Sequence, residues 1–141
     1  MADVPLSPAT VRVLVVEDDA NNRLVITRLL KLAGVLSQNI YDTDGDAIAL
    51  LNTLPPNTVD IVFLDIQLPK KDGYTILQEL RADPRYAGLR VVALTANVMR
   101  QDIERARAAG FDGFIGKPVD GRRFSETLNR LLTGESVWTV L

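Results

Sequence analysis

Five polar side chains between positions 17 and 117 end or directly follow apolar stretches of this sequence. They are Glu17, Asp18, Asp65, Thr95 and Lys117. If these residues share one pocket, its three crowded carboxylates can all stay ionised near neutral pH only beside a cation. Oxygen ligands without histidine or cysteine favour a hard ion, and Mg²⁺ is the ion we expect.

Such a pocket suits the attack of an aspartate on phosphorus, which forms an acyl phosphate. The reaction needs a cation near the phosphoryl oxygens, a fixed positive side chain and hydrogen-bond donors. Lys117 supplies a positive charge and Thr95 supplies a hydroxyl. The residue types therefore predict phosphoryl chemistry on a carboxylate.

Strands must position these residues. Apolar, β-branched runs occupy residues 11–16, 59–64, 90–94 and 111–115. Runs of this kind are typical of strands that are buried on both faces of a parallel sheet. In such sheets ligands bind beyond the carboxyl ends of the strands. Residues at those ends are therefore expected to converge, although they are far apart in the sequence.

Helical patterns separate the expected strands. A weaker strand is expected at 38–41 and the last helix at about 120–132. The first helix is expected to carry Leu24, Val25 and Leu32 together with its other leucines on one apolar side. Five strands alternating with five helices predict an α/β fold, a doubly wound five-stranded parallel sheet with right-handed crossovers.

The amino-acid composition argues against several classes of function. The chain has 141 residues, of which 47% are hydrophobic, enough for one domain with its own core. Its 16 basic and 18 acidic side chains argue against a nucleic-acid surface. The absence of histidine excludes an imidazole base and a phosphohistidine within this chain. Without a signal peptide or a membrane-spanning stretch, we expect a cytoplasmic protein.

Short motifs around the five residues closely resemble the receiver domain of two-component response regulators. These motifs are residues 15–19, 64–69, 72–73, 94–96 and 116–118. Their specificity lies in their joint spacing, because any one of them alone is weak. The resemblance implies a flavodoxin-like topology, with a leader at 1–10, a receiver domain at 11–132 and an apolar tail at 133–141.

The resemblance implies a role for each site residue. It makes Asp65 the phosphoacceptor, supplied by a histidine kinase or a histidine phosphotransfer protein. It makes Glu17 and Asp18 the acids that hold Mg²⁺ with Asp65, and the backbone carbonyl of Gln67 a further ligand. Gln67 and Asn97 each stand two residues after a site residue, so their amides are expected to tune the lifetime of the phosphorylated state.

The resemblance also implies a conformational switch. Thr95 is expected to close on the phosphoryl group and Lys117 to balance its charge. Phe114 falls where the family has a rotating aromatic, although a plain core residue is an equally good interpretation. The Lys117–Pro118 bond falls where the family has a cis peptide.

Phosphorylation is expected to shift an equilibrium between two conformations and to change the face of the fourth helix, fifth strand and fifth helix. With no attached output domain, the target is expected to be another protein. Self-phosphorylation and self-dephosphorylation are the only expected activities, so the chain is not classed as an enzyme.

Two other functions are alternatives to the receiver function. In addition, some of the acidic residues have a simpler structural interpretation. A phosphohydrolase of the haloacid dehalogenase type needs a second aspartate two residues after the nucleophile, where this chain has Gln67. A scaffolding pseudo-receiver needs no intact site. Asp19 is expected to cap a helix. Asp42, Asp44 and Asp46 are expected to form a turn and a helix cap, and not a calcium loop.

The tail contains Val137, Trp138, Val140 and Leu141, more apolar residues than an ordinary chain terminus needs. Two interpretations are open. The tail folds back over its own domain, or it contacts a second subunit and makes a homodimer.

Overall fold

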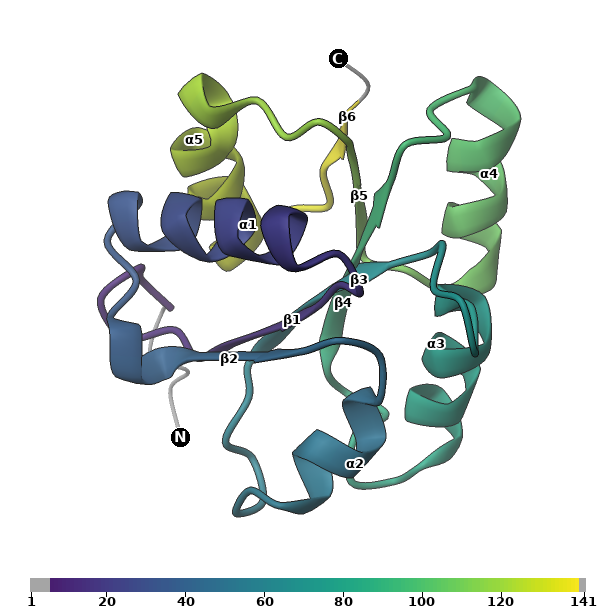
Figure 1. Cartoon of the computed structure of the whole chain (residues 1–141), viewed down its shortest axis with the longest axis horizontal. Helices are drawn as coiled ribbons and strands as arrows, with labels where there is room; N and C mark the ends of the chain where they lie inside the picture. Colours follow the sequence, from purple (N-terminus) through teal and green to yellow (C-terminus); the bar gives the residue numbers. More distant parts are fainter. Residues whose placement is uncertain (1–5, 140–141) are drawn as a thin grey trace.

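The computed structural model describes residues 6–139 and contains one parallel sheet in the order β2-β1-β3-β4-β5-β6 (Figure 1). The strands are β1 (Val13–Val16), β2 (Ile40–Thr43), β3 (Ile61–Asp65), β4 (Arg90–Thr95), β5 (Gly113–Gly116) and β6 (Trp138–Thr139). The order of β1 to β5 is that of flavodoxin-like folds, which confirms the predicted architecture. The short strand β6 is an addition that the sequence pattern did not predict.

Five helices connect the strands. They are α1 (Ala20–Leu32), α2 (Ala47–Asn52), α3 (Gly73–Ala82), α4 (Arg100–Ala109) and α5 (Gly121–Leu132). Helices α1 and α5 cover one face of the sheet, and α2, α3 and α4 cover the other (Figure 1). Residues Ser37–Asn39 form a short 3-10 turn, η1, so the second strand begins at Ile40, later than predicted.

Aspartates set the starts of several helices. Asp19 accepts a hydrogen bond from Asn22 N at the start of α1, and Asp46 accepts one from Ala49 N at the start of α2. A side-chain oxygen at this position satisfies an amide that the helix leaves without a partner. Both residues therefore have the capping role predicted from the sequence. The predicted turn is wrong for Asp42, which lies in strand β2 (Ile40–Thr43) because its backbone pairs with β1.

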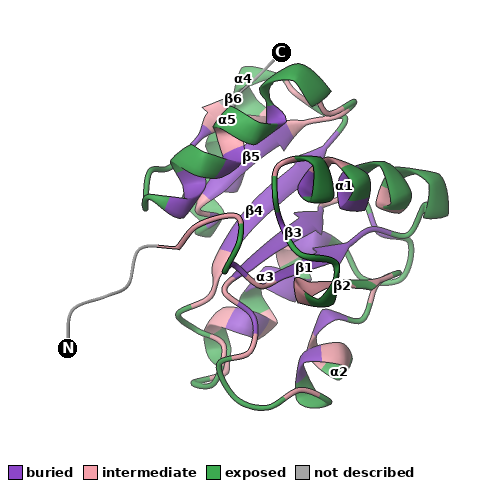
Figure 2. Ribbon diagram, turned by 90° about the vertical axis from the view of Figure 1, so that its left-hand side faces the viewer, coloured by how far each residue is buried: buried purple, intermediate pink, exposed green. Residues whose placement is uncertain are grey.

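The core has two halves, one on each face of the sheet, and Figure 2 shows buried residues along the strands between the helices. Successive strand residues alternate between the two faces. The α1/α5 half contains Val13, Val15, Ile61, Phe63, Val92 and Leu94. The α2–α4 half contains Leu14, Val16, Val62, Leu64, Val91 and Ala93. Full burial on both faces explains why these strands read as continuous apolar runs.

The predicted apolar side of α1 is wrong in part. Leu24, Val25 and Leu32 are 53%, 50% and 82% exposed, whereas Ile26 and Leu30 are buried. A helix turns about 100° per residue. Leu24 and Leu32 each lie two residues from a buried position, so they project from the opposite side of the helix.

The tail folds back over its own domain as far as the structure describes it. Val137 is buried, and Trp138 pairs with Phe114 of β5. This observation supports the first of the two interpretations of the tail; Val140 and Leu141 lie outside the described residues. In the leader, residues 1–5 also lie outside them, and Leu6 packs against the core on the α1/α5 face. No helix between residues 6 and 139 is long and apolar enough to cross a membrane.

Candidate functional site

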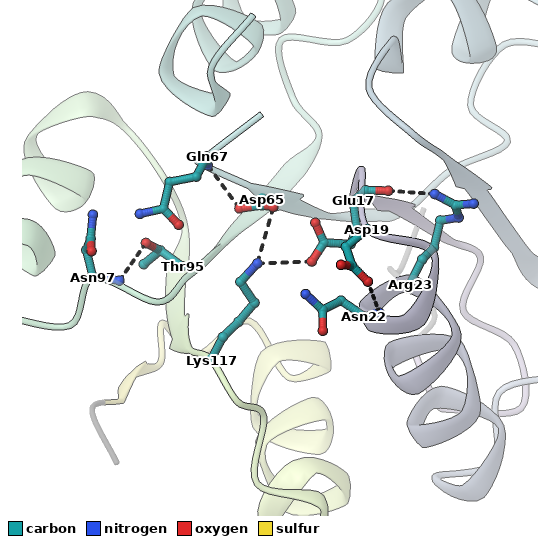
Figure 3. A network of polar contacts seen from close by, with 9 residues as sticks. All are labelled: Glu17, Asp19, Asn22, Arg23, Asp65, Gln67, Thr95, Asn97 and Lys117. Carbon is teal, nitrogen blue, oxygen red and sulfur yellow. Dashed lines mark hydrogen bonds and ion pairs between the residues drawn. The ribbon is translucent and has the colours of Figure 1, made fainter. Parts of the chain in front are cut away.

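The predicted site residues meet at the carboxyl edge of the sheet. Asp65 is the last residue of β3 and Thr95 the last of β4. Glu17 directly follows β1, and Lys117 directly follows β5. Because all four strands are parallel, their carboxyl ends lie at one edge, so the predicted convergence is what the structure shows (Figure 3).

A lysine bridges two buried carboxylates at the centre of the site. Lys117 Nζ donates to Glu17 Oε1 at 3.0 Å and to Asp65 Oδ2 at 3.2 Å (Figure 3). The side chains of Glu17 and Asp65 are 0% and 2% exposed. A buried charge is costly unless it is paired and hydrogen-bonded. The ammonium group of Lys117 therefore compensates one of the two negative charges that the fold places here.

A third carboxylate completes a cation-binding arrangement. Ligand oxygens of Glu17, Asp18 and Asp65 lie within 4.8 Å of one another, and Asp18 is on the exposed side. Among residues 6–139, no hydrogen-bond partner is available to the buried Glu17 Oε2. A buried oxygen without a partner is unfavourable. A hard cation at this cluster would satisfy it, so the donor set fits Mg²⁺.

Burial and neighbouring charges shift the pKa values of Glu17 and Lys117. Burial, together with the neighbouring Asp65 carboxylate, raises the pKa of Glu17, and the opposing effect of Lys117 is smaller. Burial lowers the pKa of Lys117, but its hydrogen bond to Glu17 and its attraction to Asp65 outweigh this and leave that pKa raised. Lys117 therefore stays positive at neutral pH, and Glu17 holds a proton more readily than an ordinary glutamate.

The loop after β3 is held tightly against Asp65. Gln67 N donates to Asp65 Oδ1 at 2.9 Å, and Gly73 N donates to Ile66 O at 2.8 Å. A Cβ on Gly73 would lie 2.7 Å from the carbonyl oxygen of Asp65 and 2.7 Å from the Cα of Ile66. Only glycine permits this approach, which explains the Asp72-Gly73 motif. The Gln67 side chain extends toward Thr95 (Figure 3).

Thr95 closes the site on the side of β4. Its side chain is buried, and its Oγ1 accepts a hydrogen bond from Asn97 N at 3.0 Å. Within the part of the chain that the structure describes, no hydrogen bond joins the Thr95 side chain to Asp65 or Lys117. The hydroxyl hydrogen can therefore be donated to a group that binds beside Asp65.

The loop that carries Lys117 is fixed through its backbone. Lys117 N donates to Thr95 O at 2.7 Å, and the Lys117–Pro118 peptide is cis, as predicted. A Cβ on Gly116 would lie 2.7 Å from Val98 Cγ1, so glycine allows the β4–α4 loop to approach. These contacts aim the long lysine side chain across the strand ends toward β1.

Arg23 is a site residue that the sequence analysis missed. Its Nη1 donates to Glu17 O at 2.8 Å (Figure 3). Its Nε lies 3.9 Å from Asp42 Oδ1. Arg23 thus anchors the backbone that carries Glu17. The available signal was a basic residue near the start of a helix, where the helix dipole disfavours positive charge.

Phe114 is fully buried in the α2–α4 half of the core. This inward position is compatible with a rotating aromatic and with a plain core residue. It does not decide between the two interpretations.

Comparison with known proteins identifies the family to which this chain is similar. A family model for the response regulator receiver domain matches residues 13–129. The polar-differentiation response regulator DivK of Brucella anthropi is 31% identical over 120 residues, which cover 85% of this chain and 94% of DivK. Hybrid signal transduction histidine kinase L of Dictyostelium discoideum is 30% identical over 122 residues, which cover 84% of this chain but only 7% of the kinase.

Solved structures share the fold. The chemotaxis protein CheY4 of Vibrio cholerae superimposes with a TM-score of 0.74 at 22% identity, over 86% of this chain and 98% of CheY4. The receiver domain of the sensor histidine kinase PA1611 from Pseudomonas aeruginosa has a TM-score of 0.70 at 27% identity, over 88% and 98% of the two chains. This chain belongs to the response regulator receiver domain family of two-component systems.

Proposed function

We propose that Asp65 accepts a phosphoryl group from a phosphohistidine of a histidine kinase or histidine phosphotransfer protein. In this step a carboxylate oxygen of Asp65 bonds to phosphorus, the phosphorus–nitrogen bond breaks, and the imidazole leaves and takes up a proton. The observation that carries the proposal is the Lys117 bridge between the Glu17 and Asp65 carboxylates. It places a fixed positive charge beside the acceptor.

We assign Mg²⁺ to the carboxylates of Glu17, Asp18 and Asp65 and to the backbone carbonyl of Gln67. The unpartnered Glu17 Oε2 supports this assignment. The PA1611 receiver domain contains a magnesium ion coordinated in its active site cleft. When bound, the ion supplies positive charge against the phosphoryl oxygens.

In this proposal Thr95 and Lys117 bind the added phosphoryl group. Thr95 donates its hydroxyl, and Lys117 exchanges part of its pairing with Glu17 and Asp65 for the new anion. Phe114, as the rotating aromatic of the switch, responds to the movement of Thr95, and the surface of α4, β5 and α5 changes. A ligand shifts such an equilibrium only by its differential affinity for the two states. The switch therefore depends on contacts that Thr95 and Lys117 make only after phosphorylation.

We assign Gln67 and Asn97 to the lifetime of the phosphorylated state. The Gln67 side chain reaches toward Thr95, where it can orient an attacking water. Single substitutions of Gln67 or Asn97 should change the self-dephosphorylation rate about tenfold, equivalent to roughly 1.4 kcal/mol in the barrier. The decay of radiolabelled protein measures this rate. Unchanged decay in both variants would contradict the assignment.

The downstream partner in this proposal is a protein target in the cytoplasm. No nucleic-acid domain is seen in the described residues. A homodimer held by the tail is the alternative, and the burial of Val137 against its own domain argues against it. The chain spans only 7% of the hybrid kinase it matches, so the activity of a whole protein of that kind is not assigned to it.

The test is intact-mass analysis after incubation with a small acyl-phosphate donor and Mg²⁺. The chain should gain one phosphoryl group that is stable in acid, labile in base and dependent on Mg²⁺. Asp65→Asn should abolish the gain, and the matched control Asp19→Asn should keep it, because Asp19 only caps α1. Full labelling of Asp65→Asn would overturn the proposal. Turnover of a phosphate monoester would favour the phosphohydrolase alternative. A failure to bind Mg²⁺ would favour the pseudo-receiver alternative.

A further inference from the structure

Arg23 reaches from helix α1 back to the residue that follows strand β1. It lies near the start of α1, where its backbone N donates to Asp19 O at 2.9 Å. Its Nη1 donates to Glu17 O at 2.8 Å (Figure 3). Only 24% of its side chain is exposed. The guanidinium group is therefore held against the backbone of the site and does not extend into solvent.

Both polar backbone groups of Glu17 have fixed partners. Glu17 N donates to Thr43 O of β2 at 3.1 Å, and Glu17 O accepts the hydrogen bond from Arg23. The Glu17 carbonyl belongs to the peptide group that joins Glu17 to Asp18. Because a peptide group is planar, a contact that holds its oxygen restricts the whole link. Arg23 thus restricts how the two acidic residues can rotate relative to each other.

Asp18 depends on this link more than the other two acids of the cluster do. Glu17 and Asp65 are buried, and both accept hydrogen bonds from Lys117. Asp18 is exposed, so packing does not hold its carboxylate in place. Its distance from the other two carboxylates is therefore set mainly by the backbone that Arg23 holds.

The neighbouring strand orients the guanidinium group. Arg23 Nε lies 3.9 Å from Asp42 Oδ1, and Asp42 pairs with Val15 in the register of β2 and β1. The side chain of Asp42 is 51% exposed, so this ion pair by itself contributes little to stability. A guanidinium group is planar and its donors are fixed relative to one another. Asp42 on one edge of the group therefore helps to direct the other edge toward Glu17 O.

The charge of Arg23 is unfavourable at this place. A positive charge is disfavoured near the N-terminus of a helix. A positive charge near a cation site also weakens cation binding through Coulomb repulsion. A gain in metal binding from Arg23 must therefore come from its hydrogen bond and not from its charge. The two effects have opposite signs, so an experiment can separate them.

We propose that Arg23 is a positioning residue of the metal site, which sets the affinity for Mg²⁺ by holding the peptide between Glu17 and Asp18. The inference rests on the proposed function, which assigns Mg²⁺ to these two acids and Asp65. Groups that hold metal ligands in place typically contribute tenfold to hundredfold to metal affinity. Mg²⁺ demands near-ideal octahedral geometry, whereas Ca²⁺ accepts irregular arrangements of oxygen ligands. Arg23 should therefore matter more for Mg²⁺ than for Ca²⁺.

The test is isothermal titration calorimetry of the full, unphosphorylated chain with Mg²⁺ and, separately, with Ca²⁺. Arg23→Met removes the guanidinium group and keeps a long, unbranched side chain. It should raise the dissociation constant of Mg²⁺ by about tenfold, and that of Ca²⁺ by a smaller factor. Arg23→Lys keeps the charge and a donor, so it should recover part of the loss.

Arg28 provides the matched control. It is an exposed arginine more than one turn further along α1. Arg28→Met removes the same charge from the same helix, so it should leave the Mg²⁺ dissociation constant unchanged or slightly lowered. Urea unfolding in metal-free buffer establishes that each variant is folded at the temperature of the titration. If Arg23→Met does not fold, Arg23→Lys carries the test, with a smaller loss that is again larger for Mg²⁺ than for Ca²⁺.

The outcomes separate this inference from the proposed function. Unchanged or tighter Mg²⁺ binding in the folded Arg23 variants would overturn the positioning role and leave the phosphoacceptor assignment intact. Equal losses for the two ions, or an equal loss in Arg28→Met, would also overturn it. A wild type that binds no Mg²⁺ and is not labelled at Asp65 would overturn the proposed function, and this inference with it.

Discussion

Glu17 carries the main electrostatic conflict of the site. Its carboxylate is fully buried beside a second carboxylate, and one of its oxygens has no hydrogen-bond partner among the described residues. Burial and the neighbouring Asp65 raise its pKa above the ordinary value of 4.5. A group whose pKa is raised in the folded state binds more protons when folded than when unfolded. Its contribution to stability is therefore complete below pH 4.5 and is lost as the pH rises through the raised pKa.

Glu17→Gln should remove this pH dependence. In metal-free buffer the unfolding free energy of the wild type should fall as the pH rises through the folded pKa of Glu17, and the variant should show a flatter profile. Glutamine retains an oxygen that can accept the hydrogen bond of Lys117. Urea unfolding at a series of pH values measures the effect. A variant with the wild-type slope would show that another group titrates.

Gly73 allows the closest backbone approach at the site. Gly73→Ala would place Cβ 2.7 Å from backbone atoms of both Asp65 and Ile66, which a flexible side chain cannot relieve. We expect a loss of about 1–3 kcal/mol in unfolding free energy, together with slower labelling of Asp65. Gly45 is the control, because its Cβ would meet nothing within 4 Å. Gly45→Ala should stay within about 0.5 kcal/mol of the wild type. Equal losses in the two variants would contradict the steric argument.

At the scale of elements, α1 is positioned by a narrow buried stripe. Leu30 is 0% exposed on the side toward the sheet, and Leu32 is 82% exposed on the other side. The two leucines are two residues apart in one helix, which makes them a matched pair.

Leu30→Ala should cost about 2–5 kcal/mol in unfolding free energy, because it leaves a cavity in the core. Leu32→Ala should change the unfolding free energy by no more than about 0.5 kcal/mol. Denaturant unfolding with circular dichroism compares the two. Similar losses would mean that Leu32 is buried in solution, as the sequence pattern alone suggested.

For the whole molecule, the proposed Mg²⁺ site would couple metal binding to folding. Glu17, Asp18 and Asp65 come from β3 and from the residues after β1, so their cluster exists only when the sheet is formed. A ligand that binds only the folded state stabilises it by mass action.

Mg²⁺ should therefore raise the unfolding free energy of the wild type, by about 2.7 kcal/mol at one hundred times its dissociation constant. Asp65→Asn should show a smaller gain, because it removes one anionic ligand, and Asp19→Asn should show the full gain. Thermal unfolding over a range of Mg²⁺ concentrations measures this. A gain in Asp65→Asn equal to that of the wild type would place the ion elsewhere.

The strands, the alternation of elements and the edge at which Asp65, Thr95 and Lys117 meet could all be predicted from the sequence. These features follow from local patterns. Buried parallel strands must be apolar on both faces, and polar residues can follow only where such strands end. The helix caps at Asp19 and Asp46 were predictable for the same reason, since each bonds to an amide three residues away.

Features that depend on residues far apart in the chain could be seen only in the folded domain. The lysine bridge joins Lys117 to Glu17 across one hundred positions, and no local pattern encodes which oxygen it reaches. The buried side of α1 depends on how the helix is rotated against the sheet, because leucines occupy several sides of it. The strand β6 has two residues, too few for a periodicity. It forms because Gly113 leaves room beside β5 and because Val137 finds a place in a core built by other elements.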